Sequence, residues 1–280
     1  MDTPQQPSTR AANAAAGATA SPAAQLTDEQ ILAGEQAIKD AVARESQLVS
    51  VPLPLTDLRQ EFQSNAPFLA KINDLATNFS HFRRCRGDGN CFYRAFVFAW
   101  YERVLGNPAR YLVRAHADMA KCKEVLLANG FQLLVIEDFH DVAVDTLKAI
   151  ETGAIHDMDM LLSRFQSDEV SNAIVVLFRF VCSAYLQQHQ DEYLPFVLDD
   201  ADTMQGYCAH HVEAMGRDAD HVSIIALSKM FAVNVVVAYL DSGAHDDATI
   251  HRFDGNEADP ADVIHFLYRP GHYDLIYPRQ

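Results

Sequence analysis

A cysteine follows a run of turn-forming residues in the segment Arg86–Phe96, which reads RGDGNCFYRAF. The four residues 87–90 are of types that permit tight or left-handed backbone. From Cys91 onward, apolar residues recur at helical spacing, which predicts a buried helix that begins at or beside the cysteine. Unpaired amides and the helix dipole would there favour a thiolate and could hold an oxyanion. The segment therefore suits a nucleophilic cysteine, and the alternative is a small core residue behind an ordinary turn.

A nucleophilic thiol needs a base, and the chain has twelve histidines. Seven of them lie among polar or helical residues, where surface or turn positions are expected: His81, His116, His140, His156, His189, His245 and His251. His210 and His211 are adjacent and not four residues apart, so they do not fit the helical metal-pair pattern. His221 begins a predicted helix, and His265 lies in an apolar strand where a core histidine is expected.

His272 differs from the other histidines because it begins a predicted terminal strand with Asp274 two residues later. Strand alternation puts both side chains on one face, so the carboxylate can orient the imidazole. Cys91 on an early helix and this pair on a late strand match a nucleophile, a base and an orienting residue. Taken alone, His272 could be a turn histidine. Together with the loop before Cys91, the catalytic interpretation is favoured.

The elements that would position these residues are helices first and strands last. Helical patterns are predicted over 67–79, Arg110–Asn129, Phe139–Glu151, Met158–Gln166, Ala173–Leu186 and Ile224–Met230. Strands are predicted over Asn234–Leu240, Ile250–Phe253, Val263–Tyr268 and Tyr273–Tyr277, the last two joined by a hairpin-like turn at 269–272. The order of elements, helix-rich first and strand-rich last, predicts an α+β fold.

Composition narrows the class of protein. The chain has 280 residues, 49% of them hydrophobic and 21% charged, which predicts a soluble globular protein. The net charge of −16 argues against nucleic acid, which requires a basic surface. No apolar run approaches the length of a membrane span, so we expect no membrane partner. Five cysteines without paired spacing indicate a reducing compartment, without a disulfide framework or structural zinc. We expect a cytoplasmic monomer, with the nucleus as an additional location.

The chain divides into three predicted parts. Residues 1–25 are rich in Ala, Pro, Ser and Thr and predict a disordered tail. Residues 26–48 predict a helical arm, because Thr27 and Gln30 form a capping box and a thin apolar stripe follows. This arm could order on a partner or pack as an ordinary helix. Residues 49–280 would form the catalytic domain, with its core from about residue 80 to residue 280.

The block that ends at Phe96 and the closing block Tyr268–Asp274 (YRPGHYD) resemble the signatures of the ovarian-tumour (OTU) cysteine proteases. Three further blocks narrow the resemblance to the otubains: Ile136–His140, Tyr185–Gln187 and Asp220–Leu227. The resemblance covers the chain from about Thr27 to the C-terminus. The combination of blocks is far more specific than the cysteine block alone.

The resemblance implies a papain-like fold with helical lobes around a small late-sequence β-sheet. It also implies hydrolysis of the isopeptide bond between ubiquitin and lysine, with a preference for lysine-48-linked chains. It implies that Cys91 is the nucleophile, His272 the general base and Asp274 the residue that orients the base. Asp88 would belong to the loop whose amides form the oxyanion hole. No metal or organic cofactor is expected, because thiolate, imidazole and amides suffice for acyl transfer.

The resemblance also implies a second function, in which the protein binds ubiquitin-charged conjugating enzymes and restrains chain synthesis without catalysis. The arm would then contact the donor ubiquitin, and Phe131–Phe139 would meet the conjugating enzyme. A third hypothesis is a papain-like hydrolase for another ubiquitin-like modifier, or a thiol acyltransferase.

Two residues near Cys91 qualify the resemblance. The family often has proline before the aspartate, whereas this chain has Gly87, so we expect a looser loop and a less preorganised oxyanion hole. Cys85 lies six residues before Cys91 and is expected to be a buried thiol, with a reversible disulfide to Cys91 as the alternative.

Overall fold

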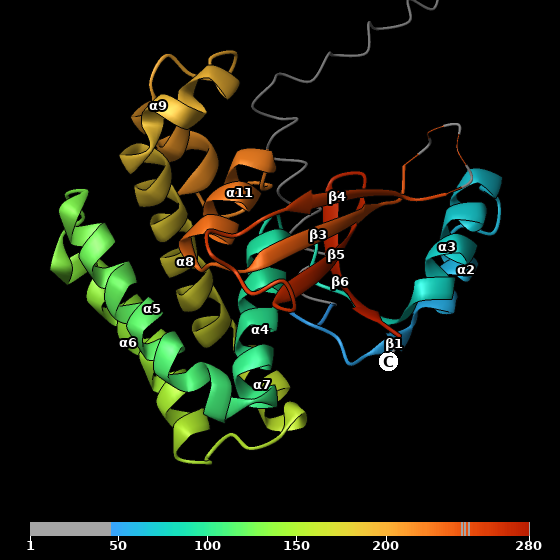
Figure 1. The fold of residues 1–280 in the computed structure, drawn as a ribbon, viewed down its shortest axis with the longest axis horizontal. Coiled ribbons are helices and arrows are strands. Elements are labelled where there is room, and N and C mark those ends of the chain that lie inside the picture. Colours follow the sequence, from blue (N-terminus) through green and yellow to red (C-terminus); the bar gives the residue numbers. More distant parts are fainter. Residues whose placement is uncertain (1–45, 242, 244, 246, 280) are drawn as a thin grey trace, which may run out of the picture. The chain divides into compact units, whose positions relative to one another are not determined.

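The computed structural model describes residues 46–241, 243, 245 and 247–279 (Figure 1). These residues belong to a unit that spans Ile38–Gln280. The predicted tail over residues 1–25 lies outside the described residues, as does the predicted arm over 26–48 except for its last three residues.

The strands in the described part of the chain form one six-stranded sheet with the order β1-β2-β6-β5-β3-β4. Their bounds are β1 Leu53–Pro54, β2 Phe79–Arg83, β3 Asn234–Tyr239, β4 Thr249–Phe253, β5 Val263–Arg269 and β6 His272–Pro278. Strands β3 and β5 pair in parallel, and the other neighbours are antiparallel. The four predicted late strands and the β5–β6 hairpin are confirmed, as is the α+β class.

Two early strands, β1 and β2, also join the sheet, and the sequence patterns did not predict them as strands. Phe79 continues the apolar spacing of the preceding helix α3 (Ala66–Asn78), so the local pattern suggested more helix. In the structure Phe79 is extended and begins β2, which pairs with β6. A partner almost 200 residues away in sequence therefore decides its conformation. Strand β2 then leads directly into the loop before Cys91.

Besides α3, the helices of the described residues are α2 Leu58–Glu61, α4 Cys91–Gly106, α5 Pro108–Ala128, α6 Leu133–Glu151, α7 Met158–Phe165, α8 Asp168–Gln188, α9 Gln190–Tyr193, α10 Met204–Tyr207 and α11 His221–Met230. Each helical pattern predicted over these residues corresponds to a helix, but α6 and α8 begin six and five residues earlier than predicted, and the short helices α2, α9 and α10 were not predicted. Short 3₁₀ turns cover Leu55–Asp57 and Leu194–Phe196, and a π-turn covers Cys208–Val212. The surface position expected for His140 is wrong. Its ring is buried between α5 and α6, with Nε2 3.0 Å from the carbonyl oxygen of Met119.

Successive strand residues point to opposite sides of the sheet, so apolar side chains emerge on both faces. Helices cover both faces and bury these side chains. On one face Val237, Phe266 and Leu275 belong to the core shared with α4, α8 and α11. On the other face Leu267 and Ile276 pack with α3. Figure 1 shows α4 between α8 and the sheet, and its first residue, Cys91, belongs to the main core.

Helix α8 combines length and apolar composition that would suffice to cross a membrane, alone among the helices of the described residues. Of its apolar window, 67% is buried within the fold. The helix packs against α4, α6 and α11, so the apolar residues have partners inside the protein. This matches the central helix of a packed core.

The N-terminus of α4 is held against strands β5 and β6 by aromatic packing. The Phe92 ring lies 5.1 Å from that of Phe266 and 5.4 Å from that of Tyr273, between ring centroids. Phe92 is almost completely buried, and its edge-to-face contact with Tyr273 adds to the stabilisation from the apolar area that it removes from water. The packing brings Cys91, the first residue of α4, beside His272, the first residue of β6.

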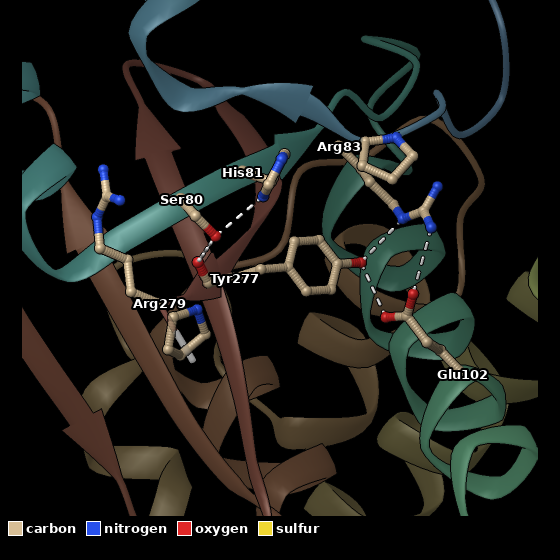
Figure 2. A pocket seen from close by; sticks show the side chains of 8 residues that line it. Ser80, His81, Arg83, Glu102, Tyr277 and Arg279 are labelled. Atoms are coloured by element: carbon tan, nitrogen blue, oxygen red, sulfur yellow. Dashed lines mark hydrogen bonds and ion pairs between the residues drawn. The ribbon is translucent and has the colours of Figure 1, made fainter.

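A buried polar network joins β2, β6 and α4 at the end of β6 remote from His272 (Figure 2). The Tyr277 hydroxyl donates to Glu102 Oε2 at 2.8 Å and accepts from Arg83 Nε at 3.1 Å. Burial raises the pKa of Glu102, although Arg83 and Tyr277 oppose this shift. The network lines a groove of about 560 Å³. It connects the three elements that carry the cysteine loop and the histidine.

The loop before α4 has one position that only glycine can fill. Gly89 has a φ of +74°, and a Cβ atom there would collide with the carbonyl group of Gly216. Gly153 has a matching φ of +75°, but a Cβ atom there would meet no other heavy atom within 4 Å. Alanine substitutions at Gly89 and Gly153 therefore separate two free-energy costs: that of the left-handed backbone, which both share, and that of the close approach to Gly216, which only Gly89 has.

We expect Gly89→Ala to lower the free energy of unfolding by more than Gly153→Ala does. Both variants incur the left-handed backbone strain of about 1–2 kcal/mol. Only Gly89→Ala must also displace the Gly216 backbone. Urea unfolding of the two variants measures the difference, and equal losses would show that the close approach carries no cost.

Candidate active site

Cys91 is the first residue of α4, as the sequence predicts, and Asn90 is its N-cap. The side chain is 2% exposed, and its Sγ accepts the backbone N–H of Tyr273 at 3.4 Å. Cys91 is a free thiol. The sulfur therefore lies between the N-terminus of the helix and the first residues of β6.

The imidazole of His272 lies between Asp274 and Cys91. Its Nε2 is 2.8 Å from Asp274 Oδ1, so Nδ1 is the ring nitrogen left for the thiol. Burial lowers the pKa of His272, but hydrogen bonds and charges from Asp274 and Cys91 outweigh burial and raise it to about 10. The arrangement favours a protonated imidazole beside the sulfur.

The carboxylate of Asp274 is fully buried and accepts from three donors. Besides His272, Oδ1 accepts the backbone N–H of Cys85 at 2.9 Å, and Oδ2 accepts Arg269 Nη2 at 2.6 Å. Burial alone would raise the pKa of Asp274, but these partners hold it below its usual value. Arg269 also pairs with Glu61 at 3.1 Å. It is a residue of the site that the sequence patterns did not predict.

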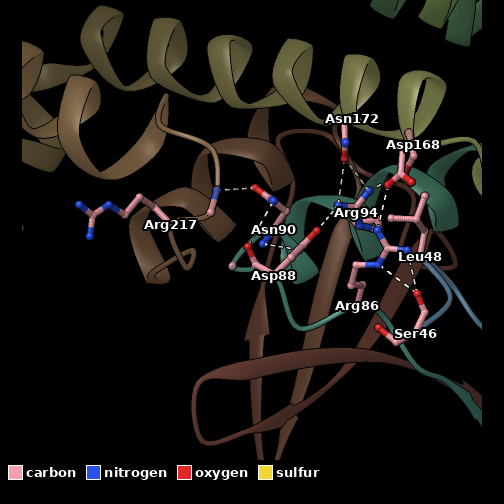
Figure 3. Close-up of polar contacts among 12 residues, drawn as sticks. Ser46, Leu48, Arg86, Asp88, Asn90, Arg94, Asp168, Asn172 and Arg217 are labelled. Carbon is pink, nitrogen blue, oxygen red and sulfur yellow. Dashed lines mark hydrogen bonds and ion pairs between the residues drawn. The ribbon is translucent and has the colours of Figure 1, made fainter. Parts of the chain in front are cut away.

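Asp88 shapes the loop before Cys91 (Figure 3). Its Oδ1 accepts the backbone N–H of Asn90 at 2.9 Å, and its Oδ2 accepts Arg94 Nη2 at 2.5 Å. Arg94 is fully buried and also donates to Ser171 Oγ of α8 at 2.7 Å. The Asp88 carboxylate is thus engaged within the loop and with α4, while its backbone belongs to the candidate oxyanion hole.

Three backbone amides of the loop are available to an anion. Within residues 46–241, no hydrogen-bond acceptor is found for the N–H groups of Asp88, Gly89 and Cys91. The N–H of Asn90 is occupied by the Asp88 side chain. Amides at a helix N-terminus suit a developing negative charge.

Arg86 anchors the other end of the loop (Figure 3). Its backbone N–H donates to the carbonyl of Leu48 at 3.0 Å, and its guanidinium reaches Ser46 at 2.8 Å and Asp168 at 2.9 Å. Gly87 lies between this anchor and Asp88, close to His272 Nδ1. The looser loop expected from Gly87 stays a prediction.

A cleft of about 540 Å³ opens on the side of His272 that faces Phe62, Arg84 and Arg269. Cys85 also lines it through a buried, free thiol, and burial raises the pKa of Cys85 well above its ordinary value. This agrees with the buried thiol expected there. Among the described residues, no group of three or more His, Cys, Asp or Glu side chains could hold a metal ion.

The raised pKa of His272 predicts a pH-dependent contribution to stability. Because the folded pKa of about 10 exceeds the ordinary value of 6.5, the contribution is complete below pH 6.5 and is lost as the pH rises toward 10. The difference in unfolding free energy between wild type and His272→Gln should therefore shrink over this window, by up to about 1.4 kcal/mol per pH unit.

Urea unfolding at several pH values checks this expectation. His156→Gln is the control, because the His156 side chain is 65% exposed and far from the cysteine loop in sequence. A wild-type advantage over His272→Gln that is as large at pH 10 as at pH 6.5 would contradict the assignment.

Known proteins match the chain along most of its length. The family model described as Peptidase C65 Otubain matches residues 41–278. The human ubiquitin thioesterase OTUB1 is 35% identical over 252 residues, which cover 89% of this chain and 90% of OTUB1. The ovarian tumour domain-containing deubiquitinating enzyme 1 of Arabidopsis thaliana is 37% identical over 243 residues, which cover 81% and 79% of the two chains.

Solved structures agree with the sequence comparisons. The complex of h/ceOTUB1 with ubiquitin aldehyde and UBC13~Ub matches with a TM-score of 0.81 and 33% identity, covering 90% of this chain and 99% of that one. The corresponding complex with UBCH5B~Ub matches with a TM-score of 0.82 and 33% identity, covering 90% and 98%. The family model, the identities and the shared fold agree, and this chain belongs to the otubain family of cysteine peptidases.

Proposed function

We propose that this protein is a deubiquitinating enzyme that hydrolyses isopeptide bonds in polyubiquitin through Cys91, His272 and Asp274. The observation that carries the proposal is the 2.8 Å contact between His272 and Asp274, beside a cysteine that begins a helix. Relatives named as ubiquitin thioesterases, and h/ceOTUB1 solved with ubiquitin aldehyde, support ubiquitin as the substrate.

In the proposed reaction the Cys91 proton is held on His272 Nδ1, so that a thiolate lies beside the protonated imidazole, and this thiolate attacks the carbonyl carbon of the isopeptide bond. The carbonyl oxygen becomes an oxyanion, and the free amides of Asp88, Gly89 and Cys91 are the candidate donors to it. The tetrahedral intermediate expels the lysine amine, which receives the proton from the imidazolium. Water then attacks the thioester while His272 acts again as the base, and ubiquitin leaves with a free C-terminus.

The two carboxylates have different proposed tasks. Asp274 holds Nε2–H of His272, which leaves Nδ1 toward the sulfur and stabilises the imidazolium. Asp88 acts through the loop, because its side chain binds Asn90 and Arg94.

A preference for lysine-48-linked chains is part of the proposal and is supported by the family resemblance. Equal cleavage of all linkages in a panel of di-ubiquitins would refute this preference.

A ubiquitin that carries a C-terminal electrophile tests the nucleophile. We expect covalent labelling of wild type and none of Cys91→Ala, with Cys208→Ala as a control because that thiol is also buried but lies on a different segment. Absence of labelling in the wild-type protein would contradict the proposed activity.

Steady-state hydrolysis of a ubiquitin–aminocoumarin conjugate compares how much His272 and Asp274 contribute to turnover. His272→Ala should lose nearly all turnover because it removes the base. Asp274→Asn should retain more, because it loses only the orientation and charge behind the base. Equal losses in both variants would contradict these roles.

A second candidate function is restraint of ubiquitination through binding of charged conjugating enzymes. The observation that favours it is an exposed apolar cluster at the start of α6, where Leu133, Leu134 and Val135 are 42%, 85% and 49% exposed. This cluster lies within the predicted contact surface Phe131–Phe139. The solved complexes of h/ceOTUB1 contain UBC13~Ub and UBCH5B~Ub, which supports a partner of this kind.

We expect Leu134→Arg to weaken inhibition of chain synthesis by a charged conjugating enzyme at least about tenfold, as loss of a central apolar contact does. Hydrolysis of ubiquitin–aminocoumarin should remain unchanged. Val113→Arg is the matched control, because Val113 is 84% exposed near the opposite end of the α5–α6 pair. Equal inhibition by the two variants would argue against this surface.

A further inference from the structure

Arg179 is a fully buried cation in the middle of the apolar helix α8. In the described part of the chain its hydrogen bonds go to carbonyl and amide oxygens and to no carboxylate. Its Nη2 lies 2.9 Å from the Gly89 carbonyl oxygen and 2.8 Å from Asn90 Oδ1. The remaining acceptors are the carbonyls of Val212 at 2.9 Å and Arg217 at 2.6 Å. The guanidinium thus joins the cysteine loop to residues 212–217.

A buried guanidinium without a carboxylate partner is costly, because its hydration is lost and an apolar side chain could fill the same space. The Tyr93 ring, 4.1 Å from the guanidinium carbon, offsets part of this cost through a cation–π contact. The cation is therefore poorly explained by stability alone. What it accomplishes is to hold specific backbone oxygens.

The peptide group between Gly89 and Asn90 is fixed at both ends. Its carbonyl oxygen accepts from Arg179, and its N–H donates to Asp88 Oδ1 at 2.9 Å. The Asn90 side chain adds a third restraint, because its Oδ1 also accepts the N–H of Gly216 at 2.9 Å. Fixing this peptide plane also sets the positions of the Gly89 and Asn90 Cα atoms, to which the two flanking peptides are joined. Those flanking peptides carry the free N–H groups of Gly89 and Cys91.

We propose that Arg179 is a positioning residue for the oxyanion hole. By binding the Gly89 carbonyl it keeps the Gly89–Asn90 peptide from rotating, which the glycine would otherwise permit. The amides of Gly89 and Cys91 then point toward the same developing negative charge. This inference rests on the proposed function, since it concerns an oxyanion formed in acyl transfer to Cys91.

The first experiment measures hydrolysis of ubiquitin–aminocoumarin by the full-length protein and its variants. Arg179→Met should lower kcat by roughly 10- to 100-fold, somewhat less than outright removal of an oxyanion-hole donor. KM should stay within about threefold, because the lost interaction acts in the transition state. Arg179→Lys should recover part of kcat by donating to one of the acceptors. The matched control Arg83→Met also removes a buried arginine, and its kcat should stay within about threefold.

The second experiment separates the oxyanion hole from the reactivity of the thiol. When Cys91 adds to ubiquitin aldehyde, a sulfur–carbon bond forms and the carbonyl oxygen takes up negative charge at the amides. When Cys91 reacts with iodoacetamide, sulfur displaces iodide at a saturated carbon and no oxyanion forms. Arg179→Met should weaken inhibition by ubiquitin aldehyde about as much as it lowers kcat. The rate of Cys91 alkylation, measured by mass spectrometry, should stay within about threefold of the wild-type rate.

Asn90→Ala provides the test if Arg179→Met does not fold, as judged by its thermal unfolding. This variant removes an acceptor of Arg179 and should show the same split, with kcat lowered and the rate of Cys91 alkylation within about threefold of wild type. An active wild type in which Arg179→Met matches Arg83→Met, or loses alkylation and hydrolysis equally, would overturn this inference alone. An inactive wild type would overturn both this inference and the proposed function.

Discussion

The buried carboxylate of Asp274 is the interaction on which the arrangement of the site depends. A fully buried charge is unfavourable unless its oxygens are bonded, and here three donors come from three segments. They are the His272 ring at the start of β6, the Cys85 backbone before the cysteine loop, and Arg269 at the end of β5. The Asp274 carboxylate therefore joins the base, the cysteine loop and the β5–β6 hairpin. Loss of one donor would leave the carboxylate less well bonded and would loosen its contacts with the other two.

Buried arginines complete the support of the cysteine loop from the opposite side. Arg94 of α4 binds Asp88, and Arg179 of α8 binds Gly89 and Asn90. Because a guanidinium offers several donors in a rigid plane, one side chain can restrain several backbone groups at once. The loop has two glycines, so its shape depends on these cations together with the Asp88 side chain, which accepts the Asn90 N–H. A flexible sequence is thereby held in one conformation by the helices around it.

Much of the candidate site could be predicted from the sequence because its signals are local. Cys91 follows turn-forming residues and begins an apolar helical run, and His272 and Asp274 share a strand face through simple alternation. The arginines could not be assigned in the same way. Several of their partners are distant in the chain, such as Ser171 for Arg94 and Gly89 for Arg179, and the nearby partner Asp88 of Arg94 lies in a loop without regular spacing. A signal did exist, because Arg94 and Arg179 each interrupt an otherwise apolar helix. Such a pattern indicates a buried cation but does not name its acceptors.

The sequence by itself determined most of the element types, the α+β order and the residues able to perform thiol chemistry, because periodicity and turn chemistry act over a few residues. Tertiary structure alone decided that Phe79–Arg83 is a strand, since pairing with β6 outweighs the helical spacing around Phe79. It also decided that Cys91 lies beside His272, through the packing of Phe92 on Phe266 and Tyr273. These contacts link segments up to about 200 residues apart, and only the folded chain satisfies them together.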